Sequence, residues 1–185
     1  MDDKVPEDGV IGNGEYAIRK FLDAAGLGKW DKYEETARAV ADFWTDFLYT
    51  PDDVPVNLLL GRDQLIVVKD SFYSICAFNL FPFWGTVFVG YLGAKGVLEL
   101  TYIQDNIKGM SHEIMTQEVL AEDVAYWLAG ALGHADVGVI VIGNHFNIKD
   151  GLRIQESVSS MMLGAFREEP SVRQEFLDLC ALCEE

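Results

Sequence analysis

The sequence predicts an α+β fold, because strand patterns and helix patterns follow one another in a distinct order. Two stretches rich in β-branched and aromatic residues, 65–75 and 85–92, are typical of strands, and a second pair is expected at 137–142 and 152–158. Between the two pairs, apolar residues recur at every third or fourth position, the period of a helix with one buried face. Two strands, two helices and two strands predict an antiparallel sheet with both helices on one face.

A helical segment is expected before this domain. Residues 1–12 are acidic, contain proline and glycine and show no period, so a disordered start is predicted. Helices are expected at 15–25 and from residue 32 or 34 to about 48. The predicted organisation is therefore 1–52 for the disordered start and the first helices, and 53–185 for the α+β domain.

Each element of the main domain carries its own signal. The first two strands form a long antiparallel pair, and the second ends at a Gly-Ala-Lys-Gly turn, 93–96. A short helix is expected at 100–109, and a long one begins at residue 111 or 116 and reaches residue 132. Asp-Gly at 150–151 favours a tight reversal between the last two strands. Pro170 suits the first turn of a final helix.

The composition excludes several classes of partner. The chain has 185 residues, 50% of them hydrophobic, and a formal net charge of -16, so it buries a core while its surface repels polyanions. Nucleic acid and anionic membranes are therefore not expected as partners. No apolar run approaches the roughly 18 residues of a membrane span, and the acidic start lacks a signal-peptide pattern, so the cytoplasm is the expected location.

The cysteines also point to a reducing compartment. Cys76, Cys180 and Cys183 are too few for a disulfide framework. Cys180 and Cys183 lie three positions apart on an apolar helix face, with no second cysteine pair or nearby histidine to complete a zinc site. We interpret these two as packing residues.

Two motifs resemble one known family. The run from Cys76 to Phe83, Cys-Ala-Phe-Asn-Leu-Phe-Pro-Phe, resembles a strand end of GTP cyclohydrolase I that reads Cys-Glu-His-His before an apolar run with Pro-Phe. The segment 160–177, with Phe-Arg-Glu-Glu and Arg-Gln-Glu-Phe-Leu, resembles the C-terminal segment of that family. The resemblance implies the T-fold, in which sheets of neighbouring copies join into a barrel. It thus implies a homo-oligomer, a decamer or another stacked-ring assembly, with sites between subunits.

The resemblance also implies that the zinc ligands of the family fall at Cys76, Asn79 and Asn147 in this chain. Zinc prefers thiolate or imidazole, and an amide oxygen is a weak neutral ligand. We therefore expect no zinc and no other cofactor, and we interpret Asn79 and Asn147 as hydrogen-bonding groups for a ligand. The acid-base residues of the same motif correspond to Ala77 and Phe78, neither of which transfers a proton.

The phosphate-binding side is altered as well. Where the family has Gly-Leu-Ser-Lys and then an arginine, this chain has Glu99, Leu100, Thr101, Tyr102 and later Asp105. Losing these cations and gaining a carboxylate would cost several kcal/mol for a bound triphosphate, so GTP is not the expected substrate. Leu100 and Thr101 keep a predicted role in ligand binding, and Tyr102 keeps one in proton transfer.

The base-binding side of the family site is retained. Gln117 and Glu118 align with the family segment whose carboxylate receives the N–H and amino hydrogens of a guanine or pterin ring. A carboxylate offers two acceptors for two adjacent donors, although by residue type alone Glu118 would be a solvated helix residue. His145 aligns with a catalytic histidine and is either an acid or base or a hydrogen-bonded core residue. Cys76 is either a buried thiol or a nucleophile that His145 activates.

Three functions follow from these residues. The first, which we favour, is a metal-independent enzyme that acts on an unphosphorylated guanine, pterin or diaminopyrimidine ring in a specialised biosynthetic pathway, by a hydrolytic, ring-opening or lyase step. The second is a non-catalytic purine- or pterin-binding or regulatory subunit. The third, a conventional zinc-dependent GTP cyclohydrolase I, needs both missing sets of ligands. Use of a different metal by Cys76 and His145 stays open.

Overall fold

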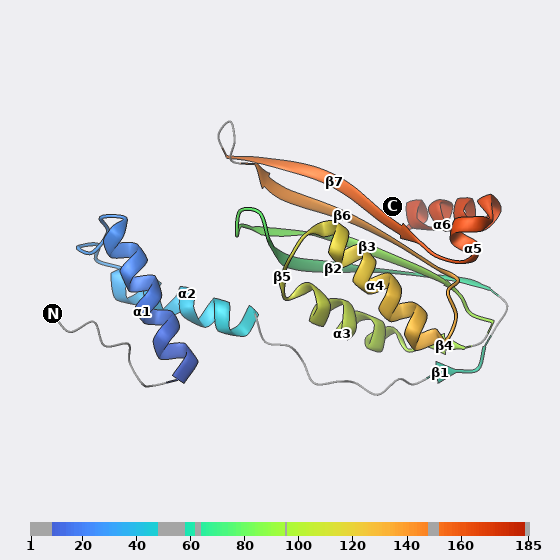
Figure 1. Ribbon diagram of the computed structural model, residues 1–185, viewed down its shortest axis with the longest axis horizontal. Helices are drawn as coiled ribbons and strands as arrows, with labels where there is room; N and C mark the ends of the chain where they lie inside the picture. The colour runs from blue at the N-terminus through green and yellow to red at the C-terminus, as the bar shows by residue number, and fades with distance from the viewer. Residues whose placement is uncertain (1–8, 48–57, 62–63, 95, 148–151, 184–185) are drawn as a thin grey trace. The chain divides into compact units, whose positions relative to one another are not determined.

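The computed structural model describes residues 9–47, 58–61, 64–94, 96–147 and 152–183. The chain divides into two compact units, Met1–Tyr49 and Thr50–Glu185, whose elements are labelled in Figure 1. The predicted domain boundary after residue 52 lies outside the described residues, and so does the predicted disordered start up to residue 8.

The first unit is a pair of helices, α1 (Gly9–Ala24) and α2 (Tyr33–Phe47). Small residues allow a close approach between them, since a β-carbon built on Gly14 would lie 3.6 Å from that of the buried Ala41. The prediction of two helices is confirmed. However, α1 begins at Gly9 rather than at residue 15, so the predicted disorder of residues 9–12 is wrong.

The second unit is built on a five-stranded sheet with the strand order β5-β2-β3-β6-β7. Its strands are β2 (Leu65–Cys76), β3 (Pro82–Leu92), β5 (Ile114–Met115), β6 (Val137–Asn147) and β7 (Arg153–Met162), beside a separate pair, β1 (Leu58–Leu59) and β4 (Val97–Leu98). Among the described strands, all pairings are antiparallel except that of β2 with β5. Both predicted strand pairs are confirmed. The short strands were not predicted, because two residues are too few to show a period.

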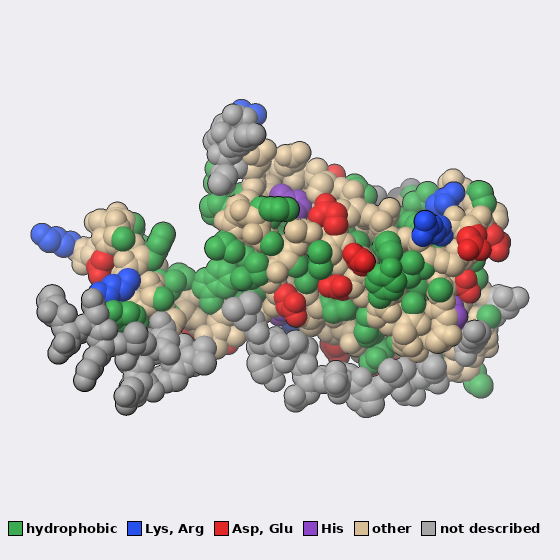
Figure 2. Space-filling model, viewed as in Figure 1, with side chains coloured by type: hydrophobic (Ala, Val, Ile, Leu, Met, Phe, Trp, Pro, Cys, Tyr) green, Lys and Arg blue, Asp and Glu red, His purple; other side chains and the backbone are tan. Residues whose placement is uncertain are grey.

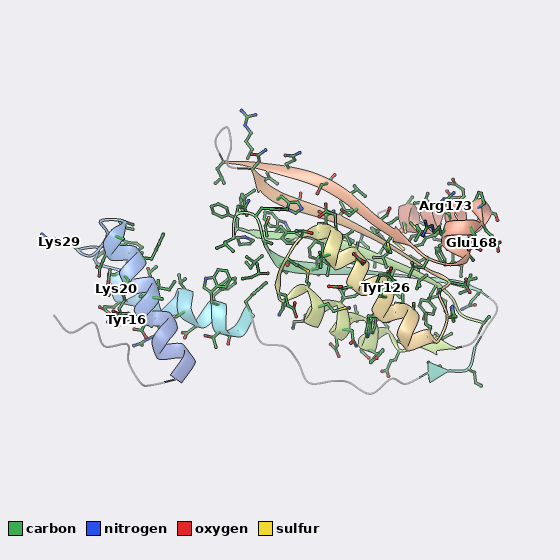
Figure 3. The ribbon with its side chains drawn as sticks, viewed as in Figure 1. Tyr16, Lys20, Lys29, Tyr126, Glu168 and Arg173 are labelled. Carbon is green, nitrogen blue, oxygen red and sulfur yellow. The ribbon has the colours of Figure 1, made fainter. Side chains whose placement is uncertain are left out.

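Two helices, α3 (Leu100–Ser111) and α4 (Gln117–Leu132), cover one face of this sheet (Figure 1). The face of α4 that the periodicity predicts is buried, and Leu120 and Val124 pack into the core with the inward-facing valines of the sheet. Tyr126 on the same helix is exposed (Figure 3). The predicted α+β arrangement of the T-fold, with two helices on one face of an antiparallel sheet, is confirmed.

The opposite face of the sheet is covered at one end. There α5 (Ala165–Glu168) and α6 (Pro170–Leu182) bring Phe166 and Phe176 together edge to face, with ring centres 5.3 Å apart. The predicted final helix is confirmed. Farther along this face apolar side chains stay in solvent, among them Val158 of β7, which is 64% exposed.

Charged side chains are unevenly distributed over the face of the second unit drawn in Figure 2. In Figure 2, acidic side chains are spread over the face that α3 and α4 form, while the main basic area lies beside α5 and α6. This distribution agrees with the net charge of -16 and disfavours polyanionic partners. Every helix in the described part of the chain is too short or too polar to cross a membrane.

Candidate functional site

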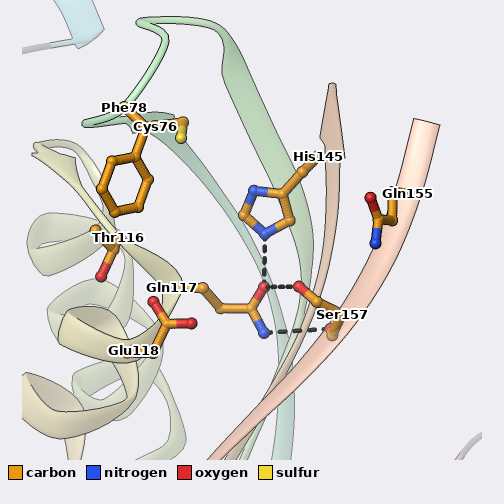
Figure 4. A pocket seen from close by; sticks show the side chains of 8 residues that line it. All are labelled: Cys76, Phe78, Thr116, Gln117, Glu118, His145, Gln155 and Ser157. Atoms are coloured by element: carbon orange, nitrogen blue, oxygen red, sulfur yellow. Dashed lines mark hydrogen bonds between the residues drawn. The ribbon is translucent and has the colours of Figure 1, made fainter. Parts of the chain in front are cut away.

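A pocket of about 230 Å³ lies where the end of β2, the start of α4 and the strands β6 and β7 meet (Figure 4). Phe78 and Glu118 stand on the α4 side of it, and His145 faces them from β6. The sequence singled out four of the side chains that meet here. The full lining consists of Cys76, Phe78, Thr116, Gln117, Glu118, His145, Gln155 and Ser157.

A short parallel pairing places the start of α4 beside Cys76. β5 runs along the end of β2, with Met115 opposite Cys76. The next residue, Thr116, is the N-cap of α4, and its side chain accepts a backbone hydrogen bond from the first turn. Gln117 and Glu118 therefore stand in that first turn, next to the end of β2.

A tight turn after β2 forms another wall. Leu80 has a positive φ of 59°, which a residue other than glycine rarely adopts without support from its surroundings. The Asn79 side chain supplies that support: its Oδ1 accepts from the Phe81 N–H at 3.0 Å, and its Nδ2 donates to the Phe146 carbonyl at 3.1 Å. The turn so held presents Phe78, whose side chain is 85% exposed.

The side chains at the zinc positions of the family do not fit a zinc ion. Cys76 offers a sulfur, but the Asn79 amide is hydrogen-bonded to backbone at both ends, and Asn147 Nδ2 donates to Gln155 Oε1 at 3.2 Å. Amide oxygens are weak zinc ligands in any case. No group of three or more His, Cys, Asp or Glu side chains among the described residues is arranged to hold a metal.

Gln117 is the centre of the polar contacts in the pocket. The residue is 2% exposed, and its Nε2 donates to the Val141 carbonyl at 2.8 Å and to the Ser157 carbonyl at 3.2 Å. Its Oε1 accepts from Ser157 Oγ at 2.8 Å and lies 2.7 Å from His145 Nε2 (Figure 4). A contact of Gln117 with a ligand stays a prediction, and it would compete with these bonds.

Stacking fixes the plane of the His145 ring, and burial favours the neutral form of the ring. Its ring stacks on Phe83, with ring centres 4.6 Å apart and 12° between the planes. Burial lowers the pKa of His145, and the negative charge of Glu118 partly offsets this effect. The residue is both hydrogen-bonded within the fold and part of the pocket lining, so it combines features of the two sequence interpretations. Its role as an acid or base stays a prediction.

The other predicted site residues lie outside this pocket. Tyr102 is buried in the core, where its ring centre is 5.5 Å from that of Trp127. Leu100 and Thr101 are exposed at the start of α3, and Thr101 Oγ1 donates to Glu99 Oε1 at 3.0 Å. Tyr102 is absent from the described lining of the pocket, and its role in proton transfer stays a prediction. Leu100 and Thr101 are likewise absent from this lining, and their role in ligand binding stays a prediction.

Sequence reasoning missed Thr116 of the lining and also two polar residues of one strand, Gln155 and Ser157. Both lie on β7, where the antiparallel register sets Gln155 opposite His145 and Ser157 opposite Gly143. Alternate residues of a strand share a face, so the predicted hairpin carries the signal. The missing information was the register, since a shift by one residue would turn both side chains away.

The fold and the site define a T-fold protein with a polar pocket at the end of its sheet. The sequence model of one family, GTP cyclohydrolase I, matches residues 14–181. The chain belongs to the GTP cyclohydrolase I family, so the resemblance seen in the sequence is confirmed.

Individual relatives agree with this assignment. GTP cyclohydrolase 1 of Homo sapiens is 35% identical over 151 residues, which cover 80% of this chain and 56% of the human protein. GTP cyclohydrolase 1 of Sulfurihydrogenibium sp. is 33% identical over 174 residues, which cover 89% of this chain and 92% of that protein. The chain thus spans little more than half the length of the human relative. A crystal structure of the apo form of archaeosine synthase QueF-Like aligns with a TM-score of 0.39 and 20% identity, over 52% of this chain and 91% of that one.

Proposed function

We propose that this chain binds an unphosphorylated guanine-, pterin- or diaminopyrimidine-type ring in the pocket and acts on it as a metal-independent enzyme. The observation that carries the proposal is the position of Glu118. At neutral pH, and with the histidine neutral, Glu118 is the charged side chain among the described residues that line the pocket. Its two carboxylate oxygens match two adjacent N–H donors, such as those on the 2-amino-4-oxopyrimidine edge of these rings.

The size and charge of the pocket favour a bare ring over a nucleotide. Its volume of about 230 Å³ is below the roughly 300–1,000 Å³ of pockets that hold drug-sized ligands. Its described lining contains neither Lys nor Arg, and a triphosphate bound without cations would pay a large desolvation cost. A single ring system with N–H donors meets neither obstacle.

His145 and Cys76 are the groups proposed to carry chemistry. The neutral imidazole would accept the proton of a water molecule or of the Cys76 thiol, and the resulting hydroxide or thiolate would add to a C=N carbon of the ring. The π electron pair of that bond would move to the nitrogen, which the imidazolium would then protonate. Both side chains line the same pocket, so a bound ring would contact both. A hydrolytic, ring-opening or lyase step is compatible with this pair.

A non-catalytic ring-binding or regulatory subunit is the second candidate. It is favoured by the amides of Asn79 and Gln117, which already serve structural hydrogen bonds and leave few groups for catalysis. Conventional zinc-dependent GTP cyclohydrolase activity, the activity that the relatives' name states, ranks third. It requires ligands that these positions do not offer.

We also propose that this chain forms a homo-oligomer. Val158 and Ile154 of β7 are exposed apolar residues on one face, and β7 is an outer strand of the sheet in the order the described residues form. An exposed apolar edge strand invites pairing with another copy. Such pairing would extend the sheet toward a barrel. A stacked ring such as a decamer stays the predicted size.

Thermal-shift measurements would separate the three functions. Guanine, guanosine, GTP, neopterin and biopterin would each be added with and without zinc. Stabilisation by bare rings without zinc is the expected result, and turnover of the stabilising ring would then decide between enzyme and binding subunit. Stabilisation by GTP alone, and only with zinc, would instead support the conventional activity.

Glu118→Ala tests the recognition step directly. Losing hydrogen bonds to a charged group should weaken ring binding by about 1.5–3 kcal/mol, roughly 10- to 150-fold in Kd by isothermal titration calorimetry. Glu122→Ala is the matched control, because Glu122 is exposed on the next turn of α4 and is absent from the described lining. Equal binding by Glu118→Ala and the parent would overturn the assignment of the pocket.

A further inference from the structure

The orientation of the Gln117 side-chain amide is determined by its neighbours. One end of the amide lies within hydrogen-bond distance of two backbone carbonyl oxygens, Val141 O at 2.8 Å and Ser157 O at 3.2 Å, and of Ser159 Oγ at 3.2 Å. A carbonyl oxygen only accepts hydrogen bonds. The amide NH₂ group must therefore stand at this end, and the amide oxygen must stand at the other.

The amide oxygen in turn determines which hydrogen His145 carries. Gln117 Oε1 accepts from Ser157 Oγ at 2.8 Å and lies 2.7 Å from His145 Nε2. An amide oxygen has no hydrogen to donate, so the hydrogen in this short contact belongs to Nε2. In a neutral imidazole one nitrogen donates and the other accepts, which leaves the lone pair on Nδ1.

The surroundings keep this contact in place. The ring of His145 cannot turn freely, because it stacks on Phe83 at 4.6 Å. The space for the contact exists because residue 143 is glycine: a β-carbon there would lie 2.3 Å from Gln117 Oε1 and 3.1 Å from His145 Nε2. In Figure 4, Nδ1 lies on the side of the ring toward Cys76 and Phe78.

We infer that Gln117 is a positioning residue that holds His145 as the Nε2–H tautomer and leaves Nδ1 as a hydrogen-bond acceptor inside the pocket. This inference deepens the proposed function and rests on it only for the identity of the ligand. Glu118 and His145 Nδ1 are then both acceptors. The ligand class is accordingly a ring that carries N–H or O–H donors on two separate edges. A ring that offers only hydrogen-bond acceptors toward His145 would leave the Nδ1 lone pair without a donor. Such a ring would bind more weakly.

The tautomer can be measured on the full chain without any ligand. Two-dimensional ¹H–¹⁵N spectra of the imidazole side chains, with His145 assigned by the signals lost in His145→Gln, should show Nε2 protonated and Nδ1 unprotonated at pH 7.5. The Nε2 proton should exchange slowly enough to be seen, because the contact is short and partly buried. A protonated Nδ1 in the neutral ring would overturn the inference.

Two variants test the part that Gln117 plays. Gln117→Leu keeps a side chain of similar size without an acceptor, so the slowly exchanging Nε2 proton should disappear and guanine should bind about fivefold more weakly. Ser159→Ala removes one of three acceptors but leaves both carbonyls, so signal and guanine affinity should stay within about twofold of the parent. A retained proton signal in Gln117→Leu, or a lost one in Ser159→Ala, would contradict the argument.

The outcome for the tautomer is separate from the outcome for the function. If guanine and pterins fail to bind, the proposed function fails while the spectra of the free protein still test Gln117. If Gln117→Leu does not fold, the spectra of the unmodified chain decide the matter alone.

Discussion

The two ends of the five-stranded sheet are built on different physical principles. At the end under α5 and α6, two buried phenyl rings press directly on the backbone. A β-carbon on Gly90 would lie 2.6 Å from the Phe176 ring, and one on Gly138 would lie 2.5 Å from the Phe166 ring. Nothing polar is needed in this contact, which stabilises through excluded water and close packing.

The pocket end instead depends on directional hydrogen bonds. It buries the amide of Gln117, supports a positive φ at Leu80 through Asn79, and leaves Phe78 in solvent. Each of these features costs stability unless its partners are in place. The comparison indicates that the α5–α6 end supplies stability, whereas the pocket end contains features that cost stability.

Phe176→Ala should have the largest effect on stability. The side chain is fully buried against Phe166 and Gly90, so truncation should lower the free energy of unfolding by about 3–5 kcal/mol in urea denaturation. Guanine affinity of the folded fraction should not change. Leu177→Ala on the same helix is the control, since an exposed side chain should cost less than about 1 kcal/mol. Equal costs for the two variants would remove the contrast between the ends.

Asn79→Ala should destabilise the pocket end to a smaller degree. The change removes bonds to the Phe81 N–H and the Phe146 carbonyl and should cost about 1–3 kcal/mol by chemical denaturation. Asn79→Asp keeps the acceptor for Phe81 and loses the donor to Phe146, so its stability should fall between parent and Ala. An Asp variant as unstable as Ala would show that the Phe146 bond alone holds the turn.

Phe78→Ala should affect binding and spare stability. The ring is exposed on the pocket lining, so the free energy of unfolding should stay within about 0.5 kcal/mol of the parent. Loss of ring stacking should weaken guanine binding by about 0.5–1.5 kcal/mol in calorimetry. Phe21→Ala, an exposed ring of the first unit, should change neither quantity. Unchanged guanine affinity in Phe78→Ala would exclude stacking at the pocket.

The smallest expected effect is on the pH dependence of stability. Burial lowers the pKa of His145 in the folded state, so the fold favours the neutral ring. Its contribution is present above the unfolded pKa of about 6.5 and is lost as the pH falls toward the lowered folded pKa. Between pH 7 and 5.5, denaturation curves of the parent should lose stability faster than those of His145→Gln. A steeper loss in the variant would reverse the assigned direction.

Local sequence was sufficient for the elements whose signals lie within the element. The periodicity of 116–132, the proline at 170 and the β-branched runs each predict a structure that the chain adopts, because amphipathic period and turn chemistry act over neighbouring residues. The alternative helix start at residue 111 is wrong, since Ser111 ends α3 and α4 begins at Gln117. The family motifs could also be recognised from short runs of sequence. Three of the residues that they single out, Cys76, Glu118 and His145, line one pocket.

The tertiary structure decided which side chains are available to a ligand. Parallel pairing of β5 with β2 places the start of α4 beside Cys76, and the β6–β7 register adds Ser157 to the pocket lining. Packing against Trp127 keeps the Tyr102 ring out of that lining. Each of these contacts joins residues distant in sequence. Their energy depends on burial and hydrogen-bond geometry rather than on local preference, so no window of the sequence records it. The role of Gln117 is the plainest case, since its partners come from β6 and β7.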